Sequence, residues 1–380
     1  MSGAKRLAFF MPSLGCGGVE RVLLRLAGAF ADRGFAVDIV VARAEGFFND
    51  GTFLAHVPEN VNIVDLRRSR VLWCLPGLAA YLKRSRPDAL LSAMDHANLI
   101  AIWAKELAKV DTRVIASVHS TASQETGGSA VKRFVLRLLL PRFLRRAAAI
   151  VAVSKGAADD YTRFMGLPEG SVRVIYNPVI GPDVLRLSDQ QPRHPWFVDK
   201  ASPLVLSVGR LTVAKDYPLL IRSMAAVHAQ TGARLVILGD GPERDSLVEL
   251  IRRSGLEKVV DMPGFTDNPY AYMKRSDVLA LSSRWEGLPT VLIEALALGT
   301  AVVSTDCPSG PAEILEGGKW GRLVPVGGAD ALAAAIIEAL KEPRRDGAVK
   351  RAADFSIDAV IQEYADVLSV SLPVSGRRSE

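Results

Sequence analysis

The chain has 380 residues, of which 49% are hydrophobic and 23% charged, and its formal net charge is +6. These values are typical of soluble globular proteins and exclude a disordered or fibrous chain, while the length suits two domains. The basic excess lies in the first half: 24 Lys and Arg stand against 15 Asp and Glu up to residue 178 (+9), and 23 against 26 beyond it (−3).

Cysteine usage and the N-terminal residues indicate the compartment. Cys16, Cys74 and Cys307 lie far apart in sequence without a CxxC pair, which argues against a disulfide framework or a zinc site and favours a reducing cytosol. The first residues are too short an apolar run for a signal peptide, and no run of 18 apolar residues follows. We therefore expect a cytoplasmic protein that is soluble or attached peripherally to the membrane.

Short β-branched runs alternate with stretches of helical apolar spacing in the first half, for example over residues 19–33. This alternation predicts a parallel sheet covered by helices. The strands expected in this half are 6–11, 37–43, 89–94, 113–119, 149–154 and 171–177.

A stretch rich in proline and polar residues interrupts the pattern at residues 181–203 and is interpreted as a linker. The alternation then restarts. The strands expected in the second half are 204–208, 234–238, 259–262, 278–282, 301–305 and 322–326.

The predicted fold class is thus α/β, with two facing Rossmann-like domains and a cleft between them that would bind the ligand. The predicted segments are a first domain at 1–180, the linker, a second domain at 204–355, a C-terminal helix at 356–372 and a disordered tail at 373–380. The C-terminal helix could cap the second domain or cross back to the first.

A glycine-rich turn follows the first expected strand in PSLGCGGVER, residues 12–21. Gly17 and Gly18 would let the backbone approach an anion at a helix N-terminus, although a plain tight turn is the alternative. The turn lacks the third glycine of G-x-G-x-x-G, as does LGDGPERD at 238–245. The main sequence evidence for a dehydrogenase is therefore missing.

Two cations follow the first strand of the second half, in SVGRLTVAKDYPLL. Arg210 offers a planar fork for two phosphate oxygens and Lys215 a mobile point charge, a combination that suits a diphosphate. Ordinary solvated loop cations are the alternative.

Two glutamates with seven residues between them stand in SRWEGLPTVLIEALALG, on either side of a Gly-Leu-Pro break. Glu286 would accept hydrogen bonds from sugar hydroxyls in the loop before a helix. Glu294, inside that helix, would hold a ribose, with the diphosphate near the amides of Gly287 and Leu288. A capping interaction and a buried ion pair are the alternative explanation.

Taken together, these motifs resemble the retaining glycosyltransferases of family 4, which have the GT-B fold. The matching pieces follow the family's order and are PSLGCGGVER, VHS at 118–120, IVAVSKGAADDY at 150–161, IYNPV at 175–179, VGRLTVAKDYPLLI at 208–221, LVILGDGP at 235–242 and SSRWEGLPTVLIEALALGTAVVSTDCPSGPAEIL at 282–315. The chain departs from many relatives in having Gly287-Leu288-Pro289 where they have Gly-Phe-Gly.

The resemblance implies site roles. Glu294 and Glu286 would hold the donor's ribose and sugar, Arg210 and Lys215 would neutralise the diphosphate, and His119 would border the sugar and the acceptor. The implied catalytic residues are His119, Arg210, Lys215 and Glu286, and the implied donor-binding residues are Gly17, Gly18, Arg210, Lys215, Gly287, Leu288 and Glu294. No Asp-x-Asp occurs in the chain, so no metal and no cofactor besides the donor are expected.

The segment VKRFVLRLLLPRFLRRAA, residues 131–148, interleaves cations with large apolar residues. A basic amphipathic segment can lie on an anionic membrane, although a packed helix with a solvated charged face is the alternative. The cations expected to face the membrane or the acceptor are Lys132, Arg133, Arg137, Arg142, Arg145 and Arg146. Sparse aromatics argue against nucleic acid as a partner.

The sequence therefore predicts a retaining, metal-independent glycosyltransferase. It would move a sugar, of the N-acetylhexosamine type, from a UDP-sugar to a lipid-linked saccharide in cell-surface glycan synthesis. The alternatives are a nucleotide-sugar epimerase of the same fold and a non-catalytic nucleotide-sugar-binding protein.

Overall fold

A computed structural model describes residues 5–14, 17–43, 57–124, 140–342 and 346–373. The chain divides into two compact units. The first unit consists of Met1–Pro178 together with Ile357–Glu380, and the second consists of Val179–Ser356. Each unit is built around its own parallel sheet.

The first unit contains a seven-stranded sheet in the order β3-β2-β1-β4-β5-β6-β7, and each neighbouring pair is parallel. This is the doubly wound order, in which the chain starts in the middle of the sheet and works outward in both directions. The strands are β1 (Arg6–Ser13), β2 (Ala36–Arg43), β3 (Val61–Asp65), β4 (Ala89–Ala93), β5 (Arg113–Val118), β6 (Ala149–Ala152) and β7 (Val172–Val174).

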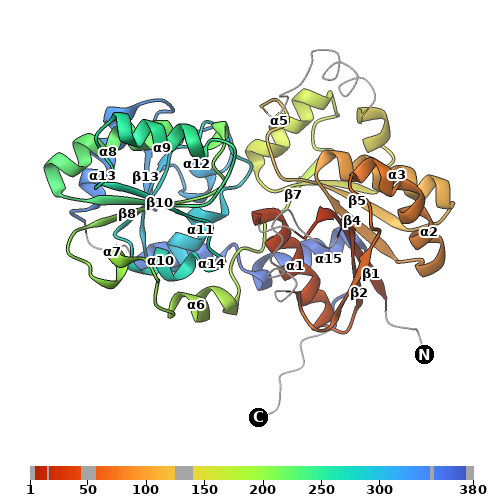
Figure 1. The fold of residues 1–380 in the computed structure, drawn as a ribbon. Coiled ribbons are helices and arrows are strands. Elements are labelled where there is room, and N and C mark those ends of the chain that lie inside the picture. The colour runs from red at the N-terminus through yellow and green to blue at the C-terminus, as the bar shows by residue number, and fades with distance from the viewer. Residues whose placement is uncertain (1–4, 15–16, 44–56, 125–139, 343–345, 374–380) are drawn as a thin grey trace, which may run out of the picture. The chain divides into compact units, whose positions relative to one another are not determined.

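Helices cover both faces of this sheet because its strands are apolar on both sides. Along β1, Ala8 and Phe10 belong to one buried cluster, and Leu7, Phe9 and Met11 to the other. The first cluster packs under α2 and α3 and the second under α1 and α15, as Figure 1 shows. The helices of this unit are α1 (Gly18–Ala31), η2 (Val71–Cys74), α2 (Leu75–Ser85), α3 (Asp95–Ala108), α5 (Lys155–Met165) and α15 (Ile357–Leu368).

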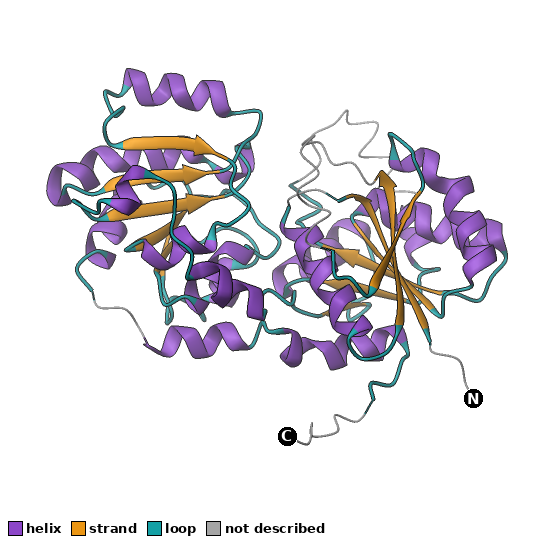
Figure 2. Cartoon of the chain, turned by 60° about the horizontal axis from the view of Figure 1, so that its bottom comes forward, coloured by secondary structure: helices purple, strands orange, loops and turns teal. Residues whose placement is uncertain are grey.

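The second unit contains a six-stranded parallel sheet in the order β10-β9-β8-β11-β12-β13. Its arrows lie side by side and point the same way in Figure 2. The strands are β8 (Leu204–Val208), β9 (Arg234–Leu238), β10 (Val260–Gly264), β11 (Val278–Leu281), β12 (Ala301–Thr305) and β13 (Arg322–Val324).

Figure 1 shows α8 and α9 on one side of this sheet and α10, α11 and α14 on the other. The arrangement is again that of a doubly wound unit. The helices are α6 (Pro182–Ser188), α7 (Pro195–Val198), η3 (Val213–Lys215), α8 (Tyr217–Thr231), α9 (Arg244–Arg253), α10 (Tyr270–Arg275), α11 (Thr290–Ala297), α12 (Pro311–Ile314), α13 (Ala329–Ala339) and α14 (Asp346–Ala353).

The structure corrects the predicted linker at 181–203. This segment belongs to the second unit and contains α6 and α7. His194 is buried there and its Nε2 lies 2.8 Å from Asp261 Oδ2, while the Asn268 side-chain amide donates to the Leu187 carbonyl at 2.9 Å. Two of the four prolines that suggested a linker, Pro182 and Pro195, instead begin the two helices, a position that proline favours.

The last helix, α15, lies in the first unit. It contacts α1, β4 and β5, and Arg113 in β5 donates from Nε to the Val367 carbonyl at 2.7 Å. The chain thus leaves the first unit after Pro178 and re-enters it at Ile357. The second unit ties its own two ends together, because the Val179 amide donates to the Phe355 carbonyl at 2.8 Å.

The packing of α15 generates a stability prediction. Tyr364 is 1% exposed among residues of β1, β4 and α1. Replacing a buried aromatic residue by alanine typically costs about 3–5 kcal/mol. We expect Tyr364→Ala to lower the free energy of opening at the β4 amides by about 3 kcal/mol, measured by native-state hydrogen exchange.

Gln362→Ala, on the exposed side of the same helix, is the matched control and should change that free energy by less than about 0.5 kcal/mol. Equal effects of the two variants would show that α15 does not contribute its buried face to the first unit.

Candidate functional site

The loop after β8 carries the two predicted cations of the second unit. Arg210 is exposed just beyond the strand, and Lys215 ends the short helix η3. Lys215 Nζ donates to Glu286 Oε1 at 2.6 Å, and both side chains are largely buried, with exposed fractions of 19% and 12%. The structure therefore brings the residue predicted to bind the diphosphate, Lys215, into direct contact with the residue predicted to bind the sugar, Glu286.

The Glu286 carboxylate has a second donor that the sequence did not reveal. Ser283 donates from Oγ to the same oxygen, Oε1, at 2.6 Å. Two hydrogen bonds to one carboxylate oxygen fix the rotamer of Glu286. A serine three residues before the glutamate was the available signal, but serine is too common in loops for that spacing to stand out.

The β8 and β11 loops are bound to each other along their length. Ser282 donates from Oγ to the Lys215 carbonyl at 2.8 Å, and the Arg284 amide donates to the Ala214 carbonyl at 2.7 Å. Arg284 Nε also donates to the buried Asp216 carboxylate at 2.9 Å. These bonds hold the Lys215–Glu286 contact in a fixed frame.

Two glycines of the LGDGP turn let a third loop pack against the loop of Arg210. Gly239 and Gly241 have φ of 146° and 159°, and a Cβ at either position would collide with backbone atoms of Gly209 or Leu211. The Leu211 amide donates to the Asp240 carbonyl at 2.9 Å across this contact. The glycines that fail as a dinucleotide fingerprint thus allow close backbone packing.

The predicted Gly287, Leu288 and Glu294 lie in and after the loop of Glu286. Ser309 donates from Oγ to the Gly287 carbonyl at 2.8 Å, and a side chain at Gly310, where φ is 96°, would collide with Pro289. Leu288 is buried, and helix α11 begins at Thr290. Glu294 is 6% exposed in that helix, so its carboxyl group lies in the interior.

Cys307 is a neighbour of this site that the sequence did not single out. It is buried, and burial together with the Glu286 charge raises the pKa of its thiol to about 12. The thiol therefore stays protonated near neutral pH and acts as a small apolar wall of the site.

In the first unit, the predicted glycines lie at the start of α1. Gly17 is the exposed N-cap residue and Gly18 is the first helical residue. The Glu20 carboxylate lies over Gly17, where a Cβ would collide with it. A carboxylate in the first turn interacts favourably with the positive end of the helix dipole. Gly15, from the same motif, lies outside the described residues.

His119 follows the carboxyl end of β5. Its Nε2 lies 3.0 Å from Ser117 Oγ, and its Nδ1 is buried without a hydrogen-bond partner among the residues that the structure describes. Burial lowers the pKa of His119 to about 4. The imidazole is therefore neutral near pH 7, with one ring nitrogen as donor and the other as acceptor.

The basic segment is described only from residue 140 onward, so Lys132, Arg133 and Arg137 lie outside the described residues. Leu140 and Leu144 are buried in the core of the first unit. Arg142 and Arg145 are exposed, and Arg146 pairs with Glu106 at 2.7 Å. In the described part of the segment, the leucines are thus buried and the arginines are exposed.

Among the described residues, no helix is long and apolar enough to span a membrane. In the same part of the chain, no three His, Cys, Asp or Glu side chains are grouped as ligands for a metal ion.

Two protein-family models match this chain, one in each half. The model described as Glycosyltransferase Family 4 matches residues 16–180. The model described as Glycosyl transferases group 1 matches residues 189–356.

Full-length relatives carry related names. The N-acetylgalactosamine-N,N'-diacetylbacillosaminyl-diphospho-undecaprenol 4-alpha-N-acetylgalactosaminyltransferase of Campylobacter jejuni is 32% identical over 330 residues, which are 85% of this chain and 86% of that protein. The amylovoran biosynthesis glycosyltransferase AmsD of Erwinia amylovora is 27% identical and covers 93% of this chain and 96% of its own length.

Solved structures share the fold. HepE of Anabaena in complex with UDP-glucose superposes with a TM-score of 0.77 at 24% identity, over 96% of this chain and 99% of that one. WaaG, a glycosyltransferase involved in lipopolysaccharide biosynthesis, gives a TM-score of 0.71 at 17% identity, over 96% and 100%.

The buried imidazole of His119 generates a pH prediction. Its pKa is about 4 in the folded chain, against about 6.5 for an unfolded histidine, so the unfolded state takes up the proton first as the pH falls. The stability of the first unit should therefore decrease from about pH 6.5 toward pH 4. We expect His119→Asn to reduce the loss of unfolding free energy between pH 7 and pH 5 by about 2 kcal/mol.

The measurement is urea denaturation of both proteins at the two pH values. Ser117→Ala is the control: it keeps the imidazole, and because burial causes the shift, it should keep the pH dependence of the wild type. An identical pH dependence for His119→Asn and the wild type would contradict the prediction.

Proposed function

The chain belongs to the family 4 glycosyltransferases and has their GT-B fold of two Rossmann-like domains, and on that basis we propose that it uses a UDP-sugar and retains the configuration of the transferred sugar. As a glycosyltransferase, it joins a sugar to an acceptor. We further propose that the acceptor is a saccharide on a lipid diphosphate and that the sugar is an N-acetylhexosamine.

The observation that carries this proposal is the 2.6 Å contact between Lys215 and Glu286. This contact sets a cation beside a carboxylate that can accept hydrogen bonds from sugar hydroxyls. Both groups follow the carboxyl ends of β8 and β11, where open α/β sheets bind ligands. A nucleotide sugar has a diphosphate next to a hydroxylated ring, which matches these two groups.

The names of the relatives support the choice of substrates. The Campylobacter relative is named for the transfer of N-acetylgalactosamine to a diphospho-undecaprenol-linked saccharide. The Anabaena structure holds UDP-glucose. A UDP-linked donor and a lipid-linked saccharide acceptor are therefore the substrates that we propose for this chain.

In the proposed reaction, the acceptor hydroxyl attacks the anomeric carbon on the face that the diphosphate leaves. The bond from the anomeric carbon to the phosphate oxygen breaks, the new glycosidic bond forms, and the acceptor proton passes to the leaving phosphate. Negative charge grows on the diphosphate, so Arg210 and Lys215 would stabilise the transition state more than the ground state.

The other site residues would bind and orient the substrates. Glu286 would accept hydrogen bonds from the sugar and Glu294 from the ribose, while the amides of Gly287 and Leu288 would face the diphosphate. Gly17 and Gly18 would approach the phosphate, and His119 would offer its Nδ1 to the sugar or the acceptor, because its Nε2 is already bonded to Ser117.

Loss of either cation should impair the chemical step. We expect Lys215→Ala and Arg210→Ala each to lower kcat by about 10²–10³-fold, because each removes charge stabilisation that develops in the transition state. The assay follows transfer from radiolabelled UDP-N-acetylhexosamines to lipid-linked saccharides extracted from cells.

Arg253→Ala, which removes an exposed arginine from α9, is the control and should retain wild-type turnover. Wild-type rates in both loop variants would contradict the proposed roles. Conversion of the UDP-sugar without an acceptor would indicate an epimerase, and UDP binding with no turnover in any protein would indicate a binding protein.

Chelation of metals tests a second part of the proposal. Because Arg210 and Lys215 would provide the positive charge and the chain has no Asp-x-Asp triplet, we expect the transfer rate to stay within about two-fold after dialysis against EDTA. A rate that falls with EDTA and returns with Mg²⁺ or Mn²⁺ would overturn metal independence, and an α-to-β change at the anomeric carbon in the product's NMR spectrum would overturn retention.

A further inference from the structure

The connection between β3 and α2 exposes two large apolar side chains. Leu72 is 64% exposed and Trp73 63%, the highest values for large hydrophobic residues in the part of the chain that the structure describes. Full burial of such a side chain is worth about 1.5–3 kcal/mol. The pair therefore forms an apolar surface whose burial by a partner would be favourable in free energy.

The two side chains are held outward by their neighbours. Cys74 is fully buried in the core of the first unit, and Val71 and Leu75 pack partly against that core. The Trp73 amide donates to the Arg70 carbonyl at 3.0 Å within the η2 turn. Because the flanking residues anchor the turn, Leu72 and Trp73 cannot fold inward without unpacking it.

Arginines precede the apolar pair in the chain. Arg67, Arg68 and Arg70 are exposed, and residues 66–87 hold six Lys and Arg and no Asp or Glu. The nearest acid in sequence, Asp65, accepts a hydrogen bond from the Arg67 amide at 2.8 Å. The surface is thus apolar in the middle and cationic at its side.

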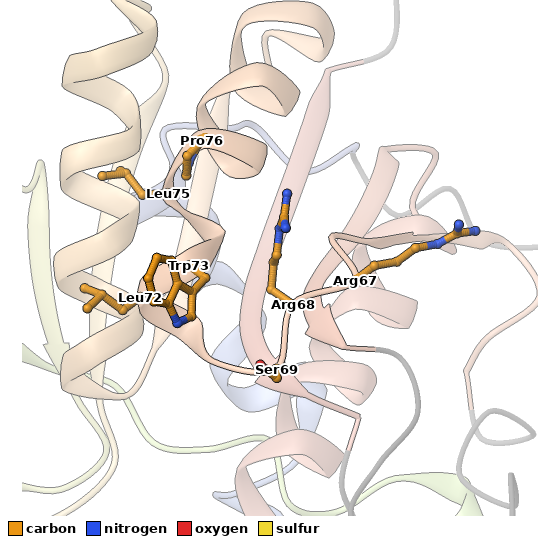
Figure 3. Close-up of a pocket in the computed structure, with 7 residues that line it drawn as sticks. All are labelled: Arg67, Arg68, Ser69, Leu72, Trp73, Leu75 and Pro76. Atoms are coloured by element: carbon orange, nitrogen blue, oxygen red, sulfur yellow. The ribbon is translucent and has the colours of Figure 1, made fainter.

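An open pocket of about 610 Å³, drawn in Figure 3, is lined by Arg67, Arg68, Ser69, Leu72, Trp73, Leu75 and Pro76. Arg68 stands beside Trp73, whereas Arg67 points away from it. The Arg68 amide donates to the Ala42 carbonyl at 2.7 Å, which fixes the backbone of the turn to the end of β2. We call residues 66–76 the Trp73 loop.

The Trp73 loop lies at the carboxyl end of its sheet, where two of the predicted site residues also lie. It follows the carboxyl end of β3, and since all strands of this sheet are parallel, the residues after β1 and β5 share that edge. Those residues are Gly17 and His119. Strands lie about 4.8 Å apart, so β3 is about 10 Å from β1 across the sheet.

We propose that the Trp73 loop binds the interface of an anionic lipid bilayer. Trp73 and Leu72 enter the boundary between headgroups and acyl chains, where an indole ring is favoured, and the arginines pair with lipid phosphates. An anionic bilayer interface binds protein surfaces that combine positive charge with an apolar centre. In the proposed function, this contact would place the carboxyl edge of the sheet near a lipid-borne acceptor.

Vesicle binding tests the inference with no donor or acceptor present, so its outcome is independent of the proposed transferase activity. The full chain is sedimented with vesicles of phosphatidylglycerol and phosphatidylcholine at low salt. We expect Leu72→Ser with Trp73→Ser to weaken binding at least about ten-fold, because two apolar side chains are removed from the interface.

The matched control is Leu107→Ser on α3, which removes another apolar side chain that is 60% exposed and should leave binding unchanged. The charge arm replaces Arg67, Arg68 and Arg70 by glutamine. A loss on the order of a hundred-fold is expected, at about 1 kcal/mol per cation near the surface.

The control for the arginine variant replaces Lys83, Arg84 and Arg86 by glutamine. This is an equal change of charge at the far end of α2, about 16 Å along the helix axis. This triple variant should bind as the wild type does.

A spectroscopic readout adds direct evidence of insertion. Lipids brominated on the acyl chains should quench part of the tryptophan emission of the wild type, and Trp73→Phe should bind but lose that quenching. Equal binding of the wild type and the double serine variant would overturn the inference. So would loss of binding in Arg142→Gln with Arg145→Gln while the Trp73 loop variants still bind, since the basic segment would then be the contact.

A protein partner is also distinguishable. Self-association that the double serine variant abolishes, without any vesicle binding by the wild type, would assign the Trp73 loop to a second copy of the chain and overturn the lipid assignment.

Discussion

The second unit's site depends on the contact between Lys215 and Glu286. Two oppositely charged side chains, mostly removed from water, hold each other at 2.6 Å, and Ser283 completes the coordination of the carboxylate. Such a pair is stable only when its remaining hydrogen bonds are made. Backbone and side-chain bonds between the β8 and β11 loops make the contact possible, because they fix both loops before any ligand arrives. The charged side chains of the site are thus held in position before a ligand binds.

Much of the fold could be predicted from the sequence because strands buried on both faces appear as continuous apolar runs. Strands β8, β9 and β12 have the predicted bounds, 204–208, 234–238 and 301–305. The prediction omitted β3, since this five-residue edge strand is half-exposed and has no such run. The interpretation of 181–203 as a linker failed for a related reason: α6 and α7 are too short to show a helical period, and their prolines mark helix starts.

For the site, spacing identified the residues but not their partners. The seven residues between Glu286 and Glu294 include a Gly-Leu-Pro break, which points to a loop and the helix that follows it, and both glutamates lie there. The contact of Glu286 with Lys215 joins residues 71 positions apart, and no local pattern encodes it. A third loop, after β9, packs closely against the β8 loop, which the positive φ angles at Gly239 and Gly241 permit. The Trp73 loop was missed because two exposed apolar residues look like core until their burial is known.

The return of α15 to the first unit has a consequence for biosynthesis. Chains are generally thought to fold domain by domain as they leave the ribosome, with the N-terminal domain first. Here the first unit cannot complete the cover on the α1 and α15 side of its sheet until α15 has been made, because Val360, Ile361 and Leu368 belong to that buried cluster. The second unit, continuous in sequence, is therefore the earlier one able to finish its core. Until α15 has been made, part of an apolar sheet face stays exposed to water in the nascent first unit.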